Sequence, residues 1–232
     1  MIPLSPQWKV AMPELVAADG HRFDSYEQRP EAARASIVIA QEIFGVNAHI
    51  RDVVDRYAAL GFHAIAPALF DRAQRGVELG YDSDGVAQGL ALRGELDWED
   101  SMADVAATVE HAAATGPVAV MGYCYGGSIA WLSASSVPVA AAVGYYGGQV
   151  HQFIDRAPSA PTMLHFGELD GGIPLSDVQA VAAAHPDVIV HIYPGADHGF
   201  NCDSRASYHE ASAALALERT LDFLASHGVV AE

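Results

Sequence analysis

Residues 118 to 134, VAVMGYCYGGSIAWLSA, constrain the fold of this chain more than any other stretch. The stretch begins with a short apolar run typical of a buried strand, and it ends with small and apolar residues at helical spacing. Between the two lies a sharp turn, in which Gly122 and Gly126 leave room for a residue in an unusual backbone conformation. The sequence therefore predicts a strand, a sharp turn and a helix, with the Cys124 thiol exposed at the carboxyl end of the strand.

The rest of the chain alternates between predicted strands and helices. Continuous apolar runs, typical of strands that are covered on both faces, occur at residues 36–40, 63–69, 139–148, 161–167 and 188–195. Helical patterns occur at residues 47–61, 99–115, 177–185 and 207–227. Asn47 can cap the first helix, and Ser207 with Glu210 forms a predicted capping box for the last one. This alternation predicts an α/β fold with a mostly parallel central sheet and helices on both faces.

Two segments depart from this alternation. Residues 8–12 and 14–19 are expected to form a short antiparallel pair of strands. Residues 70–97 contain five glycines and six acidic residues and show little apolar periodicity, so an irregular excursion over the edge of the sheet is expected there. Long insertions of this kind are usually lids or binding loops in compact domains.

Composition narrows the class of protein. A chain of 232 residues with 51% hydrophobic content fits one α/β domain spanning residues 1–232. A formal net charge of -17, with no run of basic residues, argues against a nucleic-acid partner. No apolar run is long enough to span a membrane, and the first residues lack the pattern of a signal peptide. The two cysteines suit a reducing compartment, so the expected location is the cytoplasm.

Partners for a Cys124 nucleophile follow in the expected order. A cysteine on a sharp turn between glycines is similar to the nucleophile elbow of α/β-hydrolases, in which an acid and then a histidine come from later strand ends. Asp170 follows the predicted strand at 161–167, and His198 follows the one at 188–195. A histidine can move a proton for the thiol while an aspartate fixes its tautomer. These three residues are the predicted catalytic triad.

Other interpretations of these residues are open. A single cysteine in an alanine-rich core is often only a buried thiol. Glu168 and Asp197 lie close enough in the chain to compete with Asp170 for the role of acid, although Asp170 is favoured by the glycines that follow it. His165 and His191 fall inside predicted strands and are expected to be structural.

Several segments together resemble the dienelactone hydrolase (carboxymethylenebutenolidase) family. They are IVIAQEIFGVN, GYCYGG, AVGYYGG, the loop at Asp170 and the run Asp197-His198-Gly199-Phe200, and the similarity covers essentially the whole chain. The resemblance implies an α/β-hydrolase fold and hydrolysis of a small-molecule lactone or activated ester, with no metal or cofactor. It also implies that Cys124, Asp170 and His198 form the triad. The backbone N–H groups of Ile43 and Tyr125 would form the oxyanion hole.

The resemblance further makes Glu42 a residue that contacts the thiol. A carboxylate at the end of a buried strand is desolvated, which should raise its pKa and allow it to take a proton from a neighbouring thiol. The alternative is a structural glutamate that interacts with a helix dipole.

Binding of a substrate carboxylate is harder to predict. The best-known members of the family use one arginine four residues after the catalytic histidine and another in the excursion before the long helix. Here the first position holds Cys202 and the second lies near Val86, so neither is an arginine. The candidate replacements are Arg72, Arg75 and Arg205.

Other functions are carried as alternatives. A carboxylesterase or thioesterase could use the same triad on the same fold, whereas a haloacetate-type dehalogenase would need aspartate at position 124. A non-catalytic binding protein would have no physical need for all three triad residues. The sequence does not fix the natural substrate, the role of Cys202 or the oligomeric state, for which a monomer or small homo-oligomer is expected.

Overall fold

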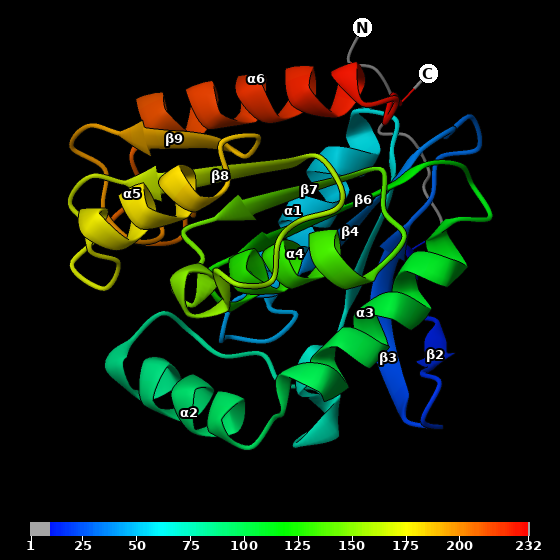
Figure 1. Cartoon of the computed structure of the whole chain (residues 1–232). Coiled ribbons are helices and arrows are strands. Elements are labelled where there is room, and N and C mark those ends of the chain that lie inside the picture. Colours follow the sequence, from blue (N-terminus) through cyan, green and yellow to red (C-terminus); the bar gives the residue numbers. More distant parts are fainter. Residues whose placement is uncertain (1–9, 232) are drawn as a thin grey trace, which may run out of the picture.

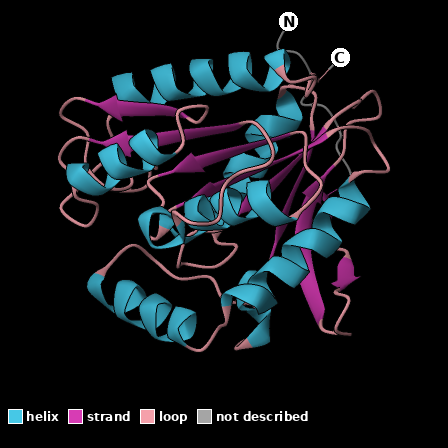
Figure 2. Ribbon diagram, in the orientation of Figure 1, coloured by secondary structure: helices cyan, strands magenta, loops and turns pink. Residues whose placement is uncertain are grey.

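The computed structural model describes residues 10–231, which form a twisted central sheet between layers of helices (Figures 1 and 2). The order of the strands across the sheet is β1-β3-β5-β4-β6-β7-β8-β9, and β2 pairs with β3. The strands are β1 (Val10–Ala11), β2 (Glu14–Val16), β3 (Arg22–Gln28), β4 (Ser36–Ala40), β5 (His63–Pro67), β6 (Val118–Tyr123), β7 (Ala141–Tyr145), β8 (Thr162–Gly167) and β9 (Ile189–Tyr193).

Six helices and two short 3-10 turns, η1 and η2, join the strands of the described chain. They are α1 (Ala48–Ala59), η1 (Leu69–Arg72), α2 (Ser83–Gly94), α3 (Trp98–Ala112), α4 (Tyr125–Ser136), η2 (Val150–Phe153), α5 (Leu175–Ala184) and α6 (Glu210–Ser226). None of the helices within residues 10–231 combines the length and the apolar character needed to cross a membrane.

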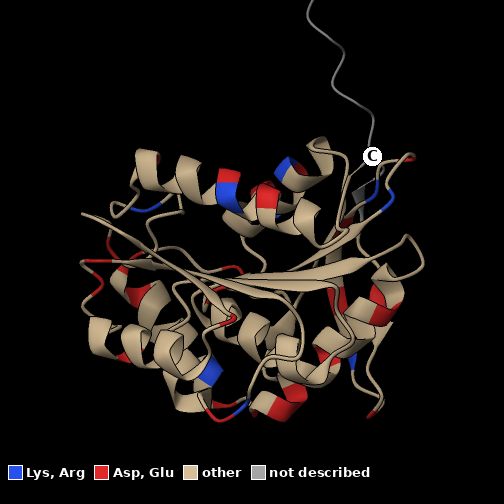
Figure 3. Cartoon of the chain, turned by 45° about the horizontal axis from the view of Figure 1, so that its top comes forward, with Lys and Arg blue, Asp and Glu red and all other residues tan. Residues whose placement is uncertain are grey.

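The two faces of the sheet bury different helices. Strands β5, β4, β6, β7, β8 and β9 run parallel to their neighbours, and only β3 with its partners is antiparallel. Along β4, Ile37 and Ile39 belong to the core shared with α1 and α6, whereas Val38 and Ala40 belong to the core shared with α3 and α4. Successive side chains of a strand point to opposite faces, so this alternation places helices on both sides. The predicted α/β architecture is confirmed, and Figure 3 shows the sheet between its helical layers.

The first helix forms as its sequence predicts. The side chain of Asn47 accepts a hydrogen bond of 3.2 Å from the Ile50 N–H, which satisfies one of the free donors at the start of α1. Gly61, just beyond the end of the helix, has a φ of 100°, a conformation that favours glycine. The same helix buries Ile50, Val53, Val54 and Tyr57, which are its four predicted apolar positions.

The expected N-terminal antiparallel pair is wrong in its pairing. Residues 8 and 9 lie outside the described residues, while Val10–Ala11 and Glu14–Val16 pair with β3 and not with each other. The strand β3, RFDSYEQ, was not predicted because it carries mostly polar residues. Its polar side chains are nevertheless largely buried, Ser25 and Glu27 among them, because helix α1 packs against β3 and because Glu27 contacts His63 and His111.

Two further predictions need correction. The excursion at residues 70–97 contains the helix α2, which its three glycines and weak apolar pattern do not reveal. Helix α6 begins at Glu210 and its N-cap is His209, whose side chain accepts from the Ser212 N–H. The predicted capping box at Ser207 therefore does not form.

Candidate active site

The turn between β6 and α4 holds Cys124 in a strained conformation. Its φ is 55° and its ψ is -113°, and its N–H donates a 2.9 Å hydrogen bond to the Tyr145 carbonyl. A Cβ on Gly122 would lie 2.0 Å from the Gly126 carbonyl oxygen, and one on Gly126 would lie 2.1 Å from the Ala40 carbonyl oxygen. Only glycine fits either position, so the backbone itself fixes the half-buried cysteine at the carboxyl end of β6.

The loops after β8 and β9 bring Asp170 and His198 together. The Nδ1 atom of His198 lies 2.7 Å from the Asp170 Oδ2 atom, and the other oxygen of Asp170 accepts from the Gly172 N–H at 2.9 Å. The Asp170 carboxylate is fully buried, whereas 27% of the His198 side chain is exposed. This geometry leaves the Nε2 atom of the histidine as the one free to exchange a proton with a neighbouring group.

The two competing acids are engaged elsewhere. Glu168 accepts a hydrogen bond from the Gly195 N–H at 2.9 Å, and Asp197 accepts one from the His198 backbone N–H at 2.6 Å. Neither carboxylate has a hydrogen bond with the His198 ring among the described residues. Asp170 is therefore the acid that orients the imidazole.

The electrostatics of His198 follow from these neighbours. Burial disfavours the charged ring, but the hydrogen bond with Asp170 and the interaction with the Cys124 thiol outweigh it and raise the pKa of His198 to about 10. An imidazole that keeps its proton near neutral pH stabilises a thiolate beside it.

The two predicted oxyanion donors are open. Ile43 follows β4, and Tyr125 is the first residue of α4. Among residues 10–231, no hydrogen bond uses the backbone N–H of either residue. The Gly126 N–H donates to the Gln41 carbonyl at 2.9 Å, which fixes the two segments against each other. Two free N–H groups on segments that are held together are compatible with an oxyanion hole, which also requires that both point at one oxygen position.

Glu42 is completely buried, and its carboxylate has two partners. The Tyr81 hydroxyl donates to Oε2 at 2.9 Å, and the Nη1 atom of Arg205 lies 3.5 Å from Oε1. No hydrogen bond between Glu42 and the Cys124 thiol is found in the described part of the chain. The carboxylate is thus held by Arg205 and Tyr81, on the loop that carries Ile43.

The structure brings only one of the three candidate arginines to this site. Arg205 contacts Glu42. Arg72 instead pairs with Asp104 and Asp19, and Arg75 pairs with Glu14, on the side of the sheet that β2 and α3 cover. Both of these arginines therefore form ion pairs that link separate segments of the fold.

Two site residues were missed from the sequence. Tyr81, from the excursion, binds Glu42. Tyr146 has a φ of 40°, is fully buried, and places its ring 5.1 Å from the ring of His198. Its hydroxyl oxygen has no hydrogen-bond partner among the described residues. The available signal for Tyr146 was its place in AVGYYGG at the end of a predicted strand. The two glycines that follow it, Gly147 and Gly148, indicate a sharp turn.

Cys202 lies close to Glu42 as well. The donor atoms of Glu42, His49 and Cys202 are all within 4.8 Å of one another, and all three residues are buried. Burial and the charge of Glu42 raise the pKa of the Cys202 thiol to about 11. These donors suit a soft metal ion, but the guanidinium of Arg205 beside the carboxylate opposes a second cation there.

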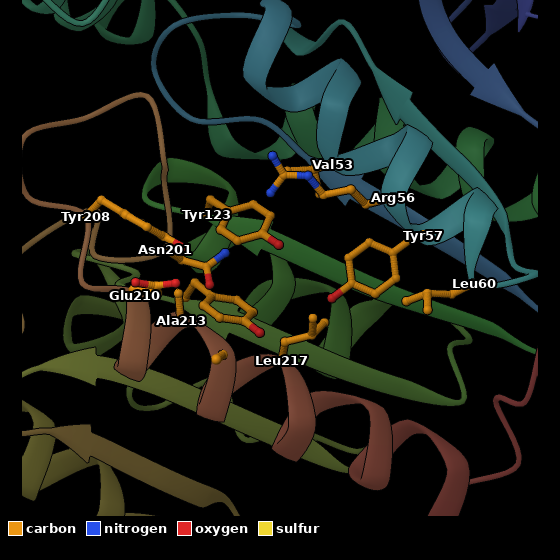
Figure 4. A pocket seen from close by; sticks show the side chains of 12 residues that line it. Val53, Arg56, Tyr57, Leu60, Tyr123, Asn201, Tyr208, Glu210, Ala213 and Leu217 are labelled. Atoms are coloured by element: carbon orange, nitrogen blue, oxygen red, sulfur yellow. The ribbon is translucent and has the colours of Figure 1, made fainter. Parts of the chain in front are cut away.

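A cavity of about 310 Å³ lies on the face of the sheet that α1 and α6 cover (Figure 4). It opens between α1, which contributes Val53 and Leu60, and α6, which contributes Leu217. None of the triad residues lines it, so this cavity is separate from the candidate catalytic site.

Comparison with known proteins agrees with this geometry. Residues 23–228 match the dienelactone hydrolase family. A carboxymethylenebutenolidase from Pseudomonas putida is 37% identical over 218 residues, covering 89% of this chain and 92% of the relative. Carboxymethylenebutenolidase 1 from Cupriavidus pinatubonensis is 32% identical over 224 residues, covering 91% and 95%.

A solved structure is also similar. It is a Klebsiella pneumoniae subsp. pneumoniae protein provisionally named dienelactone hydrolase, with a TM-score of 0.79 and 30% identity over 93% of this chain and 98% of that one. The α/β-hydrolase fold expected from the sequence is therefore confirmed.

Proposed function

Because the chain belongs to the dienelactone hydrolase family, we propose that it hydrolyses a lactone or an activated ester through a triad of Cys124, His198 and Asp170. The observation that carries this proposal is the 2.7 Å contact between His198 and Asp170 at the site where the strained elbow presents Cys124. A non-catalytic scaffold would gain nothing from a strained cysteine beside an oriented histidine.

The reaction follows from these positions. The Cys124 thiolate attacks the carbonyl carbon, and the N–H groups of Ile43 and Tyr125 bind the oxyanion that forms. His198 gives its proton to the leaving alkoxide, and the C–O bond breaks to leave a thioester acyl-enzyme. A water molecule, deprotonated by His198, then attacks the thioester, and the thiolate departs as the acid product forms.

Glu42 is proposed to activate the thiol. Its carboxylate lies on the same loop as Ile43, and a turn away from Arg205 and Tyr81 would let it accept the Cys124 proton. The Glu42→Gln variant keeps the shape but removes the base, and it leaves one acceptor oxygen where Tyr81 and Arg205 now find two. We expect kcat to fall about 100-fold with KM nearly unchanged, and activity to return partly as the pH approaches the free-thiol pKa of about 8.5. A normal kcat between about pH 6 and 9 would leave Glu42 a structural role.

The substrate class depends on Arg205. Its side chain is 22% exposed and is the one cation among the candidates beside the site, so it is positioned to receive a substrate carboxylate. The second candidate is a carboxylesterase or thioesterase acting on neutral substrates. That reading is favoured by the pairing of Arg205 with Glu42, which already neutralises its charge. The proposed setting is cytoplasmic, as a monomer or small homo-oligomer without a nucleic-acid partner.

The test is a hydrolysis screen with three substrate groups: anionic lactones, p-nitrophenyl esters and acyl thioesters. We expect turnover of at least one group, a mass increase equal to the acyl group when the reaction is quenched early, and loss of both in Cys124→Ala. An intact enzyme with no turnover and a Cys124 that reacts with thiol reagents no faster than a free thiol would point to a binding protein instead. Retention of more than about a tenth of the activity in Cys124→Ala would refute the nucleophile, because triad members act as a unit.

A further inference from the structure

Three metal-binding side chains meet at the end of the sheet away from Cys124. Glu27 comes from β3, His63 is the first residue of β5, and His111 lies in the last turn of α3. One donor atom from each lies within 4.8 Å of the others. We propose that this cluster is a binding site for zinc or a similar divalent transition metal ion, with two histidines and one carboxylate as ligands.

The distances suit such a site. The Nε2 atom of His111 lies 3.3 Å from Glu27 Oε1, and the Nε2 atom of His63 lies 2.6 Å from the same oxygen. Zinc bonds to nitrogen and oxygen of about 2.0–2.2 Å require tetrahedral donors to stand about 3.3 Å apart. The His111 contact already has that length, and the His63 contact must open by less than about 1 Å. Two histidines and a glutamate leave the fourth position for water.

The neighbours of His63 orient its Nε2 atom toward Glu27. The Ser36 hydroxyl donates its single proton to the Ala112 carbonyl at 2.9 Å, so it can only accept from the His63 Nδ1 atom 3.2 Å away. The Thr115 hydroxyl lies 2.9 Å from the same Nδ1 atom. The proton therefore sits on Nδ1, and Nε2 faces the carboxylate. Metal-ligating histidines almost always donate their other N–H in this way.

A bound ion would replace the direct contact between His63 and Glu27. It would take the Nε2 lone pair of His63 and an oxygen of the Glu27 carboxylate, and any proton held between these two side chains would leave to solvent.

Access and charge favour a cation here. The His63 side chain is 1% exposed and Glu27 is 9% exposed, while His111 is 36% exposed and provides the route from solvent. The described contacts of Glu27 include no arginine or lysine, in contrast to Glu42 beside Arg205. Figure 1 shows α3 beside β3, so one ion would bind three elements that are far apart in the sequence.

The site is independent of the hydrolase chemistry. His63 and Ser36 begin β5 and β4, whereas Cys124 follows the end of the six-residue β6, which pairs with β4 from Ser36 onward. Six residues of strand span about 20 Å. The expected role of the ion is therefore to stabilise the fold, and turnover should not require it.

The test uses the full-length chain carrying Cys124→Ala, so that the catalytic thiol cannot bind the probe. Stripped of metal, this protein is titrated with Co²⁺ and separately heated with and without Zn²⁺. We expect one ion per chain, visible absorption typical of tetrahedral cobalt, and a Tm increase of about 5–10 °C when zinc exceeds its Kd about 100-fold. X-ray absorption of the zinc-loaded protein should show nitrogen and oxygen neighbours and no sulfur.

Variants make the assignment specific. His111→Gln keeps a partly exposed polar side chain and should weaken binding at least 10-fold, whereas the control His151→Gln removes a histidine of similar exposure that lies 3.7 Å from Asp177 and should change nothing. Several results would overturn the proposal: no binding below millimolar metal, equal binding by His111→Gln and its parent, or a sulfur neighbour, which would move the ion to Cys202. The absorption measurement needs no variant at the site, so a sulfur neighbour would still overturn the proposal if His111→Gln folds poorly.

Discussion

At the scale of single residues, the proton on His198 depends on its partner Asp170. The pKa of His198 is raised to about 10, with Asp170 the main stabilising contact. Because this lies above the ordinary value of 6.5, the charged ring stabilises the folded chain below that pH, and the stabilisation is lost as the pH rises through about 10. In Asp170→Asn we expect the pKa of His198 to fall toward 6.5, as measured by NMR titration of the ring nitrogens.

The pH dependence of stability, compared between the parent and Asp170→Asn, is a second test of this prediction. The unfolding free energy of the parent, measured with urea, should decrease from neutral to alkaline pH. The Asp170→Asn variant should lose most of this pH dependence. If the pKa of the His198 ring were unchanged in Asp170→Asn, the contact with Cys124 would be enough to raise it without Asp170.

Cys202 is predicted to be a packing residue. It is fully buried, and its pKa of about 11 keeps the thiol protonated at neutral pH. Replacing it with alanine should leave kcat/KM within a few fold of the parent and lower the unfolding free energy by about 1 kcal/mol. Steady-state kinetics and urea unfolding measure the two effects. A loss of turnover as large as in Cys124→Ala would demand a mechanism with two thiols.

The positions of the candidate triad residues could be predicted because they lie at strand ends. Cys124, Asp170 and His198 follow three strands in a set order, and the structure joins the last two directly. The partners of Glu42 could not be predicted, since Arg205 is 163 residues away and reaches it only after the whole sheet has formed. Tyr146 was missed because nothing in its identity announces a positive φ.

At the scale of elements, Arg72 joins η1 to α3. Its Nε and Nη2 atoms bind both oxygens of Asp104, at 2.9 and 2.8 Å, and Asp104 is fully buried. Arg72→Ala would leave that charge buried without its partner, so we expect a loss of about 3–5 kcal/mol in unfolding free energy. KM for anionic lactones should stay unchanged where the variant is folded. A raised KM with unchanged stability would restore Arg72 as a substrate contact.

Helix α2 is predicted to fix the position of the loop that carries Ile43, the proposed oxyanion donor, by packing against it. A Cβ on Gly89 would lie 2.1 Å from the Ile43 carbonyl oxygen, so Gly89→Ala must push the helix or the loop aside. We expect kcat to fall at least 10-fold, because a small displacement of an oxyanion donor has a large effect. Gly94→Ala in the same helix is the control, since its Cβ meets nothing within 4 Å.

The control variant Gly94→Ala should itself change the stability of the chain. Alanine at Gly94 should raise the unfolding free energy by up to about 1 kcal/mol with normal turnover. Equal turnover in Gly89→Ala and Gly94→Ala would separate α2 from catalysis.

Elements with strong apolar periodicity were predictable, and those defined by tertiary contacts were not. The bounds of β4 agree with the predicted run at 36–40, because its side chains are apolar on both faces. Helix α2 escaped prediction because two of its glycines, Gly85 and Gly89, are required by close approach to the Gly80 and Ile43 carbonyls rather than favoured by helix propensity. His209 replaced the expected Ser207 cap, since cap geometry depends on where the preceding loop lets the helix begin.

At the scale of the whole molecule, net charge should govern the encounter with substrate. The chain carries a formal net charge of -17, and Figure 3 shows acidic residues spread over many elements with few basic ones. An anionic lactone is repelled, and salt screens the repulsion over a Debye length of about 10 Å at 0.1 M. We expect kcat/KM for an anionic lactone to rise several-fold from low salt to about 0.5 M salt. A neutral ester, measured in parallel, should show little change, and equal salt responses for both would rule out repulsion.

The contacts of Gly122 and Gly126 with neighbouring backbone have a consequence for how new activities can be obtained from this scaffold. At the elbow, the backbone of Gly126 packs directly against the backbone of Ala40 and of Gly122. A side-chain atom added at either glycine would therefore meet a carbonyl oxygen. A mutant library aimed at this turn would consist mostly of misfolded chains. Segments 70–97 and 199–209 supply Tyr81 and Arg205 from outside that packing. Laboratory evolution toward another substrate should therefore diversify these two segments and leave the turn untouched.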